Sequence, residues 1–126
     1  MPAFYKIDKE RRIVLTSGSG TLALADAKAH QQRLANDPDF DPSFSQIADF
    51  TQFTQFDLSS EDIRQMAERS LFSPHSRRAF IVPNDFAFGL ARMFEILRDL
   101  AGEKGIRVCR GLEEALDWVL SKSTSP

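Results

Sequence analysis

The sequence predicts a single α/β domain with a mixed, mostly parallel sheet that helices cover. Three observations lead to this prediction. Short apolar or alternating runs are separated by amphipathic segments of helical length, which is typical of β-α-β units. The chain opens with two strand-like runs joined by a short polar turn, which predicts one antiparallel hairpin. Its 126 residues have the size of one domain with a substantial core.

The first part of the chain predicts a β-hairpin followed by a helix. Residues 3–9 (AFYKIDK) alternate apolar and polar side chains, and residues 12–16 (RIVLT) form a second strand-like run. Residues 17–20 (SGSG) predict a flexible loop, because they lack the lysine and the spacing of a phosphate-binding loop. A helix is expected over about residues 22–36. His30 borders its buried face, and we expect it to bond to a backbone group rather than to a ligand.

A third strand and an irregular connection are predicted next. Residues 45–50 (SQIADF) read as a strand that ends in the carboxylate Asp49. Phe50, Phe53 and Phe56 then recur every three residues. This spacing fits neither a strand nor a long helix, so it predicts an irregular or single-turn connection.

A capping pair predicts where the second helix begins. Ser59 and Asp62 have the spacing at which a hydroxyl can bond to an early amide while a carboxylate lies at the positive end of the helix. Apolar side chains then share one face, so we expect this helix over residues 60–72.

The last part of the chain predicts two more strands, each followed by a helix. Residues 78–82 (RAFIV) read as a central strand, and the preceding Arg77-Arg78 pair is expected to be a solvated strand flank rather than an anion site. Helix three follows to about Leu100, and Gly89 within it predicts close backbone packing. Residues 106–109 and 112–120 give the last strand and helix, so the predicted order is β-β-α-β-α-β-α-β-α.

Composition and charge restrict the class of protein. The chain is 42% hydrophobic and 27% charged, which is ordinary for a globular protein, and its net charge of −2 gives no basic field for nucleic acid. A single cysteine excludes an intramolecular disulfide. No run approaches the roughly 20 apolar residues of a membrane span or has signal character, so we expect a cytoplasmic protein. The domain is expected over residues 1–120, with a flexible tail at 121–126.

Few residues predict chemistry. The only histidines, His30 and His75, are not at the carboxyl end of a predicted strand, where open α/β sheets build sites. Residues 37–41 imitate the start of a calcium loop but lack its later glycine and glutamate. We therefore expect no catalytic residue, metal or cofactor. An enzyme would instead require a perturbed carboxylate or arginine near Asp49 and Asp57.

The order of elements and residues 47–63 (IADFTQFTQFDLSSEDI) resemble the domain of sulfate transporters and anti-sigma-factor antagonists, the STAS superfamily. In that superfamily a strand ending in Asp-Leu-Ser is followed by Asp-Ser-Ser-Gly-Leu at a helix start. Asp49-Phe50-Thr51 and Asp57-Leu58-Ser59-Ser60 are similar at the same separation. Further similarity to the sporulation stage II protein AA-like bacterial domains lies in KIDKERRIVLTSGSGTL, LANDPDFDPSFSQIADF, GLARMFEIL and EEALDWVL.

The resemblance implies a non-enzymatic regulatory or protein-interaction domain. Asp49, Asp57, Ser59 and Ser60 are then the expected phosphorylation or interaction residues, with a protein partner or a second copy of the chain. The sequence departs from the family at two positions. Leu58 stands where the phosphorylated serine directly follows the aspartate, and Ser60 stands in place of the glycine. Ser59 is therefore either a switch residue or a plain helix cap.

Phenylalanine content supports a second hypothesis. The chain has 11 Phe but one Trp and one Tyr. Phe53, Phe56, Phe86 and Phe88 are expected to form a hydrophobic surface that binds a lipid, another hydrophobic ligand or a membrane surface. The stage II AA-like domains that the chain resembles are similar in fold to lipid-exchange domains, which is consistent with this alternative.

Overall fold

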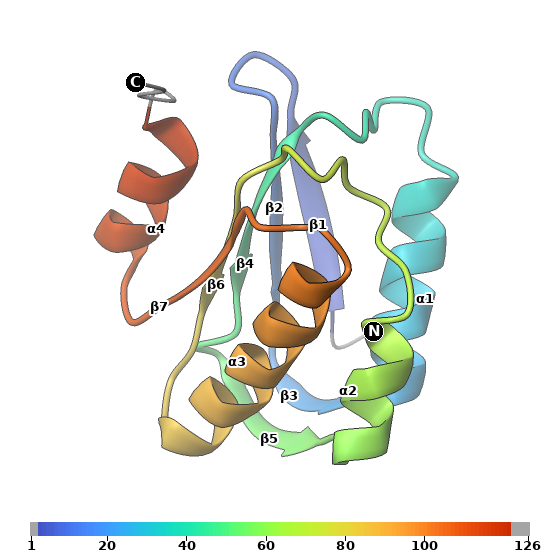
Figure 1. Ribbon diagram of the computed structural model, residues 1–126, viewed down its shortest axis with the longest axis vertical. Helices are drawn as coiled ribbons and strands as arrows, with labels where there is room; N and C mark the ends of the chain where they lie inside the picture. Colours follow the sequence, from blue (N-terminus) through green and yellow to red (C-terminus); the bar gives the residue numbers. More distant parts are fainter. Residues whose placement is uncertain (1–2, 122–126) are drawn as a thin grey trace.

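In the computed structural model, which describes residues 3–121, five strands form one mixed sheet in the order β1-β2-β4-β6-β7 (Figure 1). β1 is antiparallel to β2, and the other neighbouring pairs are parallel. The predicted hairpin and the mostly parallel sheet are thus confirmed. The strands of this sheet are β1 (Ala3–Asp8), β2 (Ile13–Gly18), β4 (Ser45–Asp49), β6 (Arg78–Ile81) and β7 (Ile106–Cys109).

The helices in residues 3–121 cover the two faces of the sheet unequally (Figure 1). Three helices lie on one face and α4 lies on the other. Because side chains alternate along a strand, Ile47 of β4 packs with Ala115 and Val119 of α4, whereas Ala48 packs with Phe94 of α3. The helices are α1 (Leu24–Ala35), α2 (Ser60–Met66), α3 (Asp85–Leu100) and α4 (Leu112–Leu120).

A second, two-stranded parallel sheet corrects the predicted order of elements. β3 (Gly20–Ala23) pairs with β5 (Phe53–Asp57). The sequence predicts the end of a loop and the start of a helix for the first segment, and an irregular connection for the second. Gly20 has a φ of +79°, which lets the chain turn directly from β2 into β3. Leu22 and Phe53 are buried together, and this long-range contact stabilises two strands too short to be recognised alone.

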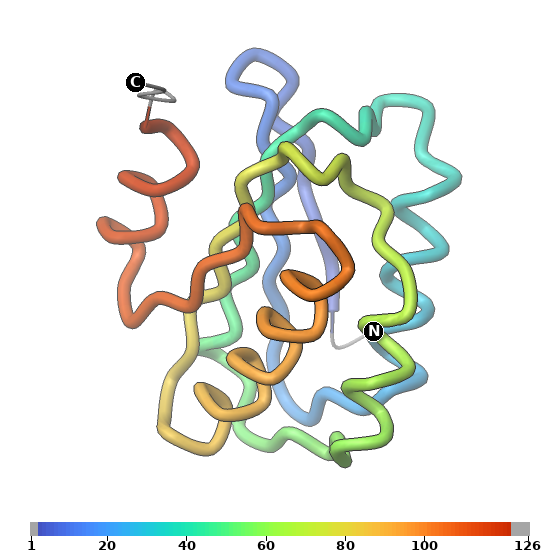
Figure 2. Tube along the Cα trace, viewed as in Figure 1, coloured from blue at the N-terminus to red at the C-terminus, as the bar shows by residue number. Residues whose placement is uncertain are grey.

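α2 is shorter than predicted, since it ends at Met66 rather than Phe72. Arg98 Nη1 donates a hydrogen bond of 2.9 Å to the carbonyl of Ala67, which provides a partner for a carbonyl at the helix end. Residues 67–77 then run back toward the opposite end of the sheet, where β6 begins (Figure 2). The buried Phe72 packs with Leu34 of α1 in this segment.

Two glycines differ from expectation. Nothing lies within 4 Å of a Cβ built on Gly89, so the predicted close packing there is wrong. Gly105, before β7, is the closely packed glycine, because its Cβ would lie 2.0 Å from the carbonyl oxygen of Ser76. Within residues 3–121, no helix combines the length and apolar character needed to cross a membrane. Of the predicted tail, residues 122–126 lie outside the described residues.

Candidate functional site

The predicted switch residues form local capping and turn structures. Ser59 Oγ accepts from the amide of Asp62 at 3.1 Å, and Asp62 Oδ2 accepts from the amide of Ser59 at 3.0 Å, which confirms the predicted capping pair. Asp49 Oδ1 accepts from the amide and the hydroxyl of Thr51 at 2.9 and 2.6 Å. Asp57 and Ser60 are exposed. Among the described residues, no hydrogen bond or ion pair links Asp49 with Asp57.

The predicted hydrophobic surface does not form as one patch. Phe53 is buried between the two small strands and the start of β1, so it belongs to no surface. Phe56 is half-buried and its ring lies 6.5 Å from that of Phe50. Phe88 is half-buried beneath the guanidinium of Arg110, at 4.5 Å, and Phe86 alone among the four is widely exposed, at 61%.

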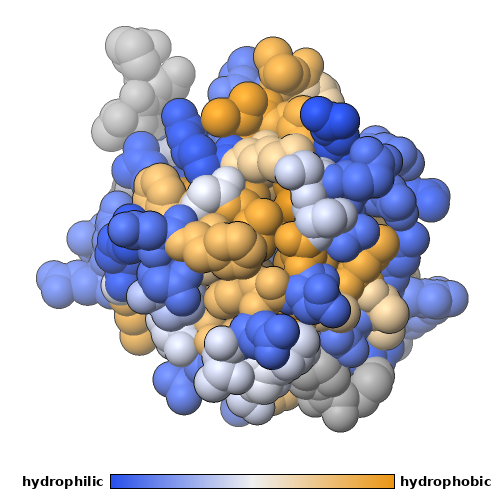
Figure 3. Space-filling model, turned by 90° about the horizontal axis from the view of Figure 1, so that it is seen from below, coloured by the Kyte–Doolittle hydropathy of each residue, from blue (hydrophilic) through white to orange (hydrophobic). Residues whose placement is uncertain are grey.

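A cavity of about 130 Å³ lies between the main sheet and the three helices on its larger face. Figure 3 views the molecule from the end where β3 and β5 lie, and it shows apolar side chains gathered at the centre of this end and extending to one edge, with hydrophilic side chains on either side. The apolar lining comes from every element that surrounds the cavity. It includes Ala27 and Leu34 of α1, Ile63 and Met66 of α2, Leu90, Ala91 and Phe94 of α3, Ala48 and Phe80 of the sheet, and Leu22, Phe50, Phe56 and Leu58.

The cavity extends toward the carboxyl ends of the central strands. Phe50 and Val82 come directly after β4 and β6, and both line it. Gln46 and Arg78 line it nearer the other end of the same strands, where they are paired in register. Phe50 comes four positions after Gln46, which corresponds to about 13 Å along an extended strand. The cavity therefore has an apolar end at the strand termini and a polar inner end.

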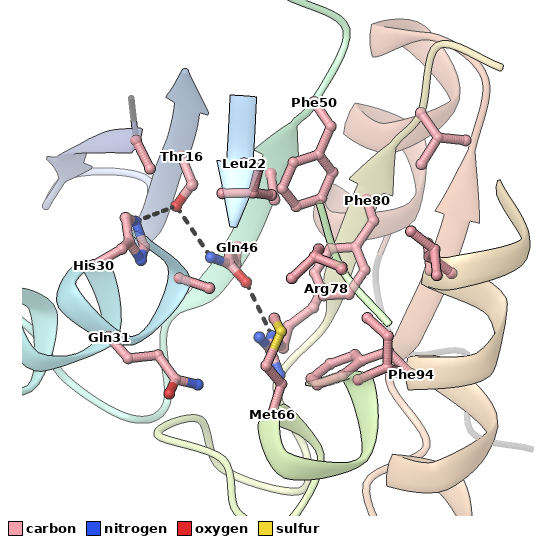
Figure 4. Close-up of a pocket in the computed structure, with 18 of the residues that line it drawn as sticks. Thr16, Leu22, His30, Gln31, Gln46, Phe50, Met66, Arg78, Phe80 and Phe94 are labelled. Atoms are coloured by element: carbon pink, nitrogen blue, oxygen red, sulfur yellow. Dashed lines mark hydrogen bonds between the residues drawn. The ribbon is translucent and has the colours of Figure 1, made fainter. Parts of the chain in front are cut away.

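A row of buried polar side chains forms that inner end (Figure 4). Arg78 Nε donates to Gln46 Oε1 at 3.0 Å, and Gln46 Nε2 donates to Thr16 Oγ1 at 3.0 Å. Thr16 Oγ1 lies 3.2 Å from His30 Nε2. An arginine can only donate, so the amide oxygen of Gln46 must face it and its amide nitrogen must face Thr16. The order of donors and acceptors from Arg78 through Gln46 to Thr16 is therefore fixed.

His30 is uncharged at neutral pH in this environment. Burial lowers the pKa of His30 to about 4, with further lowering by the charges of Arg33 and Arg78. Because Thr16 already accepts from Gln46, its hydroxyl hydrogen is available to His30 Nε2, which favours the tautomer protonated on Nδ1. The expected bond from His30 to a backbone group is therefore replaced by one to a buried hydroxyl.

Arg78 is the charged member of the row, and the prediction of a solvated strand flank was wrong for it. Its side chain is 8% exposed, and Nη1 donates to Glu103 Oε2 at 3.0 Å. The guanidinium carbon lies 4.4 Å from the ring centre of Phe72 and 5.3 Å from that of Phe80. Burial lowers the pKa of the Arg78 guanidinium, while the carboxylate of Glu103 opposes this change. An arginine still remains protonated in proteins.

Nucleophilic chemistry is not favoured by the groups near the cavity. Cys109 packs on the other face of the sheet with Ile81 and Ala115, and burial raises the pKa of its thiol to about 11, so it stays protonated. In the part of the chain that the structure describes, no three His, Cys, Asp or Glu side chains are grouped closely enough to hold a metal ion. The arrangement is suited to binding: an apolar chamber with directed hydrogen bonds at one end.

Comparison of the chain with models of protein families, with curated proteins and with solved structures gave no match.

Proposed function

We propose that this chain is a non-catalytic binding domain whose cavity takes a small, mainly apolar ligand. The observation that carries the proposal is the cavity of about 130 Å³ lined by the sheet, α1, α2 and α3. Its apolar end reaches the carboxyl ends of β4 and β6, the edge at which open α/β sheets usually bind ligands. An engineered cavity of about 150 Å³ binds benzene, so a ring or a chain of about six carbons has a suitable size.

The mainly apolar lining of the cavity supports this proposal. An apolar ligand removes such surface from water, which is worth about 25 cal/mol per Å² of apolar area buried. A ligand that binds only the folded chain would also raise its stability by mass action.

Two alanines on α1 allow a matched test of ligand binding. Ala27 lines the cavity, whereas Ala25 is exposed on the same helix. Isothermal titration calorimetry with hexan-1-ol should detect binding to the wild-type chain and to Ala25→Leu. Ala27→Leu should lose it, because the added side chain occupies the cavity. Binding that is absent from the wild type, or unchanged in Ala27→Leu, would exclude the cavity as the site. Native mass spectrometry of the purified chain would show a co-purified ligand directly.

In this proposal, the resemblance to the STAS superfamily concerns the fold of the chain. The antiparallel first strand, the parallel strands after it and the helix between successive strands support a STAS-like arrangement. The β3–β5 sheet is an addition to the expected order. A STAS-like domain of this kind suits a regulatory role in which ligand binding changes contacts with another protein.

A protein-interaction role is the second candidate, and exposed apolar side chains on α3 favour it. Leu100, Phe86 and Ile96 are 82%, 61% and 44% exposed. Contact surfaces are marked by contiguous apolar patches, and a partner that covered the exposed side chains of α3 would bury them together. We propose a protein partner or a second copy of the chain as the occupant, with Ser59 as a phosphorylation site. Sedimentation of the wild type and of Phe86→Ser would test self-association, which should weaken in the variant.

A further inference from the structure

Two arginines share one carboxylate beside the cavity. Arg98 Nε donates to Glu103 Oε1 at 2.9 Å, while Arg78 Nη1 donates to Glu103 Oε2 at 3.0 Å. The three side chains are 11%, 1% and 8% exposed for Arg98, Glu103 and Arg78. The cluster therefore carries one more positive charge than negative in a position with little water. A buried charge without a counter-charge is costly, so this end of the cavity favours a negative group.

One nitrogen of Arg78 remains available for a ligand. The hydrogen bonds of the guanidinium are made by Nε to Gln46 and by Nη1 to Ser70 and Glu103. Nη2 bonds to none of the described residues. No buried side-chain nitrogen or oxygen among residues 3–121 lacks a hydrogen-bond partner, so Nη2 is not fully shielded from water. Because Arg78 lines the cavity, we infer that Nη2 faces it.

The groups around Arg78 limit what can approach it. Gln46 bonds to it (Figure 4), and the rings of Phe72, Phe80 and Phe94 lie around its guanidinium carbon, with centres at 4.4, 5.3 and 5.8 Å. None of the described residues that line the cavity carries a carboxylate. A cationic ligand would thus meet a like charge without compensation. An anion on an apolar body would place its charge at Nη2 and its carbons against the aromatic and aliphatic lining.

We propose that the ligand of this cavity is a small carboxylate with an apolar body of about six carbons, bound with one carboxylate oxygen at Arg78 Nη2. This proposal rests on the proposed binding function and adds the chemical class of the ligand. Charge-assisted hydrogen bonds of this type are about twice as strong as neutral ones. The apolar chain extends toward Phe50 and Val82 at the strand ends, and Gln46 holds the guanidinium in place.

A matched pair of probes tests the class of ligand without any mutation. Hexanoate is ionised at neutral pH, and hexanamide has the same chain with an uncharged head. Calorimetry on the wild-type chain should give hexanoate an affinity at least about tenfold above that of hexanamide, and the preference should persist at raised salt, because screening acts weakly on buried charges. Equal affinities for the two probes would overturn the carboxylate proposal and leave the apolar cavity in place. Absence of binding by both probes would overturn the binding function itself.

Three variants test whether the preference for hexanoate over hexanamide depends on Arg78. Arg78→Met should bring the two affinities close together, and Arg78→Lys should keep part of the preference because it keeps the charge. Arg92→Met is the control, since Arg92 is exposed on α3, pairs with Glu95 and does not line the cavity. A hexanoate preference that survives in folded Arg78→Met would overturn the role of Arg78. If Arg78→Met fails to fold, Arg78→Lys and the wild-type comparison still decide the proposal.

Discussion

Arg78 and Glu103 form an ion pair of 3.0 Å whose side chains are 8% and 1% exposed. The pair connects the start of β6 with the loop after α3, and Arg98 of α3 joins it through the second oxygen of Glu103. Arg78 also donates a hydrogen bond to Gln46, and these two side chains form the inner end of the cavity. Stability and the proposed ligand site therefore depend on one buried charge cluster.

Removing the carboxylate should be strongly destabilising. Glu103→Gln leaves two buried guanidinium groups without a counter-charge, so we expect the free energy of unfolding to fall by about 3–5 kcal/mol. Urea unfolding followed by circular dichroism would measure this. Glu61→Gln is the control, because Glu61 and Arg64 are both widely exposed and 4.0 Å apart, and it should change stability by less than about 1 kcal/mol. Similar losses for the two variants would contradict the importance of the buried cluster.

The close approach at Gly105 gives a second prediction. A Cβ there would lie 2.0 Å from the carbonyl oxygen of Ser76, and the Gly105 carbonyl is held by Arg78 N and Trp118 Nε1 at 2.8 and 2.9 Å. The backbone cannot easily shift, so Gly105→Ala should lower the free energy of unfolding by about 1–3 kcal/mol. Gly89→Ala, in open space within α3, should raise it by up to about 1 kcal/mol. Thermal unfolding of both variants compares the two, and a stabilising Gly105→Ala would refute the close contact.

Stability should depend on pH through His30. Its pKa is about 4 in the folded chain, below the ordinary value of 6.5, so the unfolded chain binds a proton that the folded chain does not between these values. The part of the free energy of unfolding that depends on His30 being neutral is fully present above about pH 6.5 and is lost as the pH falls toward 4. We expect a loss of about 3 kcal/mol over this range, since one pKa unit corresponds to about 1.4 kcal/mol.

His30→Gln isolates this contribution, because the aspartates titrate in both proteins. The free energy of unfolding of the wild type, measured relative to that of His30→Gln, should fall as the pH falls from about 6.5 to 4. His75→Gln is the control, since His75 is exposed. Parallel pH profiles for the wild type and His30→Gln would show that His30 is not held neutral.

Ser59 allows its capping role to be separated from a switching role. Ser59→Ala removes the hydroxyl that accepts from Asp62 N and should cost about 1 kcal/mol, whereas Ser59→Asp keeps a good capping group and should stay near wild type. Ser60→Ala is the matched control outside the capping pair. If phosphorylation acts here, Ser59→Asp should also change association in sedimentation experiments. A Ser59→Ala variant as stable as the wild type would argue against the cap.

Much of the fold could be predicted from the sequence because its signals are local. The alternation in residues 3–9, the apolar run at 78–82 and the amphipathic pattern of α3 all lie within one element. β3 and β5 could not be predicted in this way. They pair across about 30 residues of chain, and the burial of Leu22 against Phe53 that stabilises them is a long-range contact.

The site was harder to predict, because polar residues form its inner end. Arg78 begins β6 and Gln46 is the second residue of β4, and both positions also suit a solvated flank. One observation in the sequence could have identified them. Each is a polar residue near the start of a predicted central strand, and the two strands are neighbours in the sheet. Glu103, the counter-charge of Arg78, lies 25 residues away in a loop with no pattern of its own.

The central claim is that an apolar ligand binds inside the cavity, and a titration followed by methyl NMR tests it most directly. Adding hexan-1-ol should produce saturable shifts in the methyl signals of Ile63, Met66 and Leu90, which line the cavity. Leu116 and Val119, which pack on the opposite face of the sheet, should stay unchanged. Shifts that do not saturate, or that are equal on both faces, would contradict the claim.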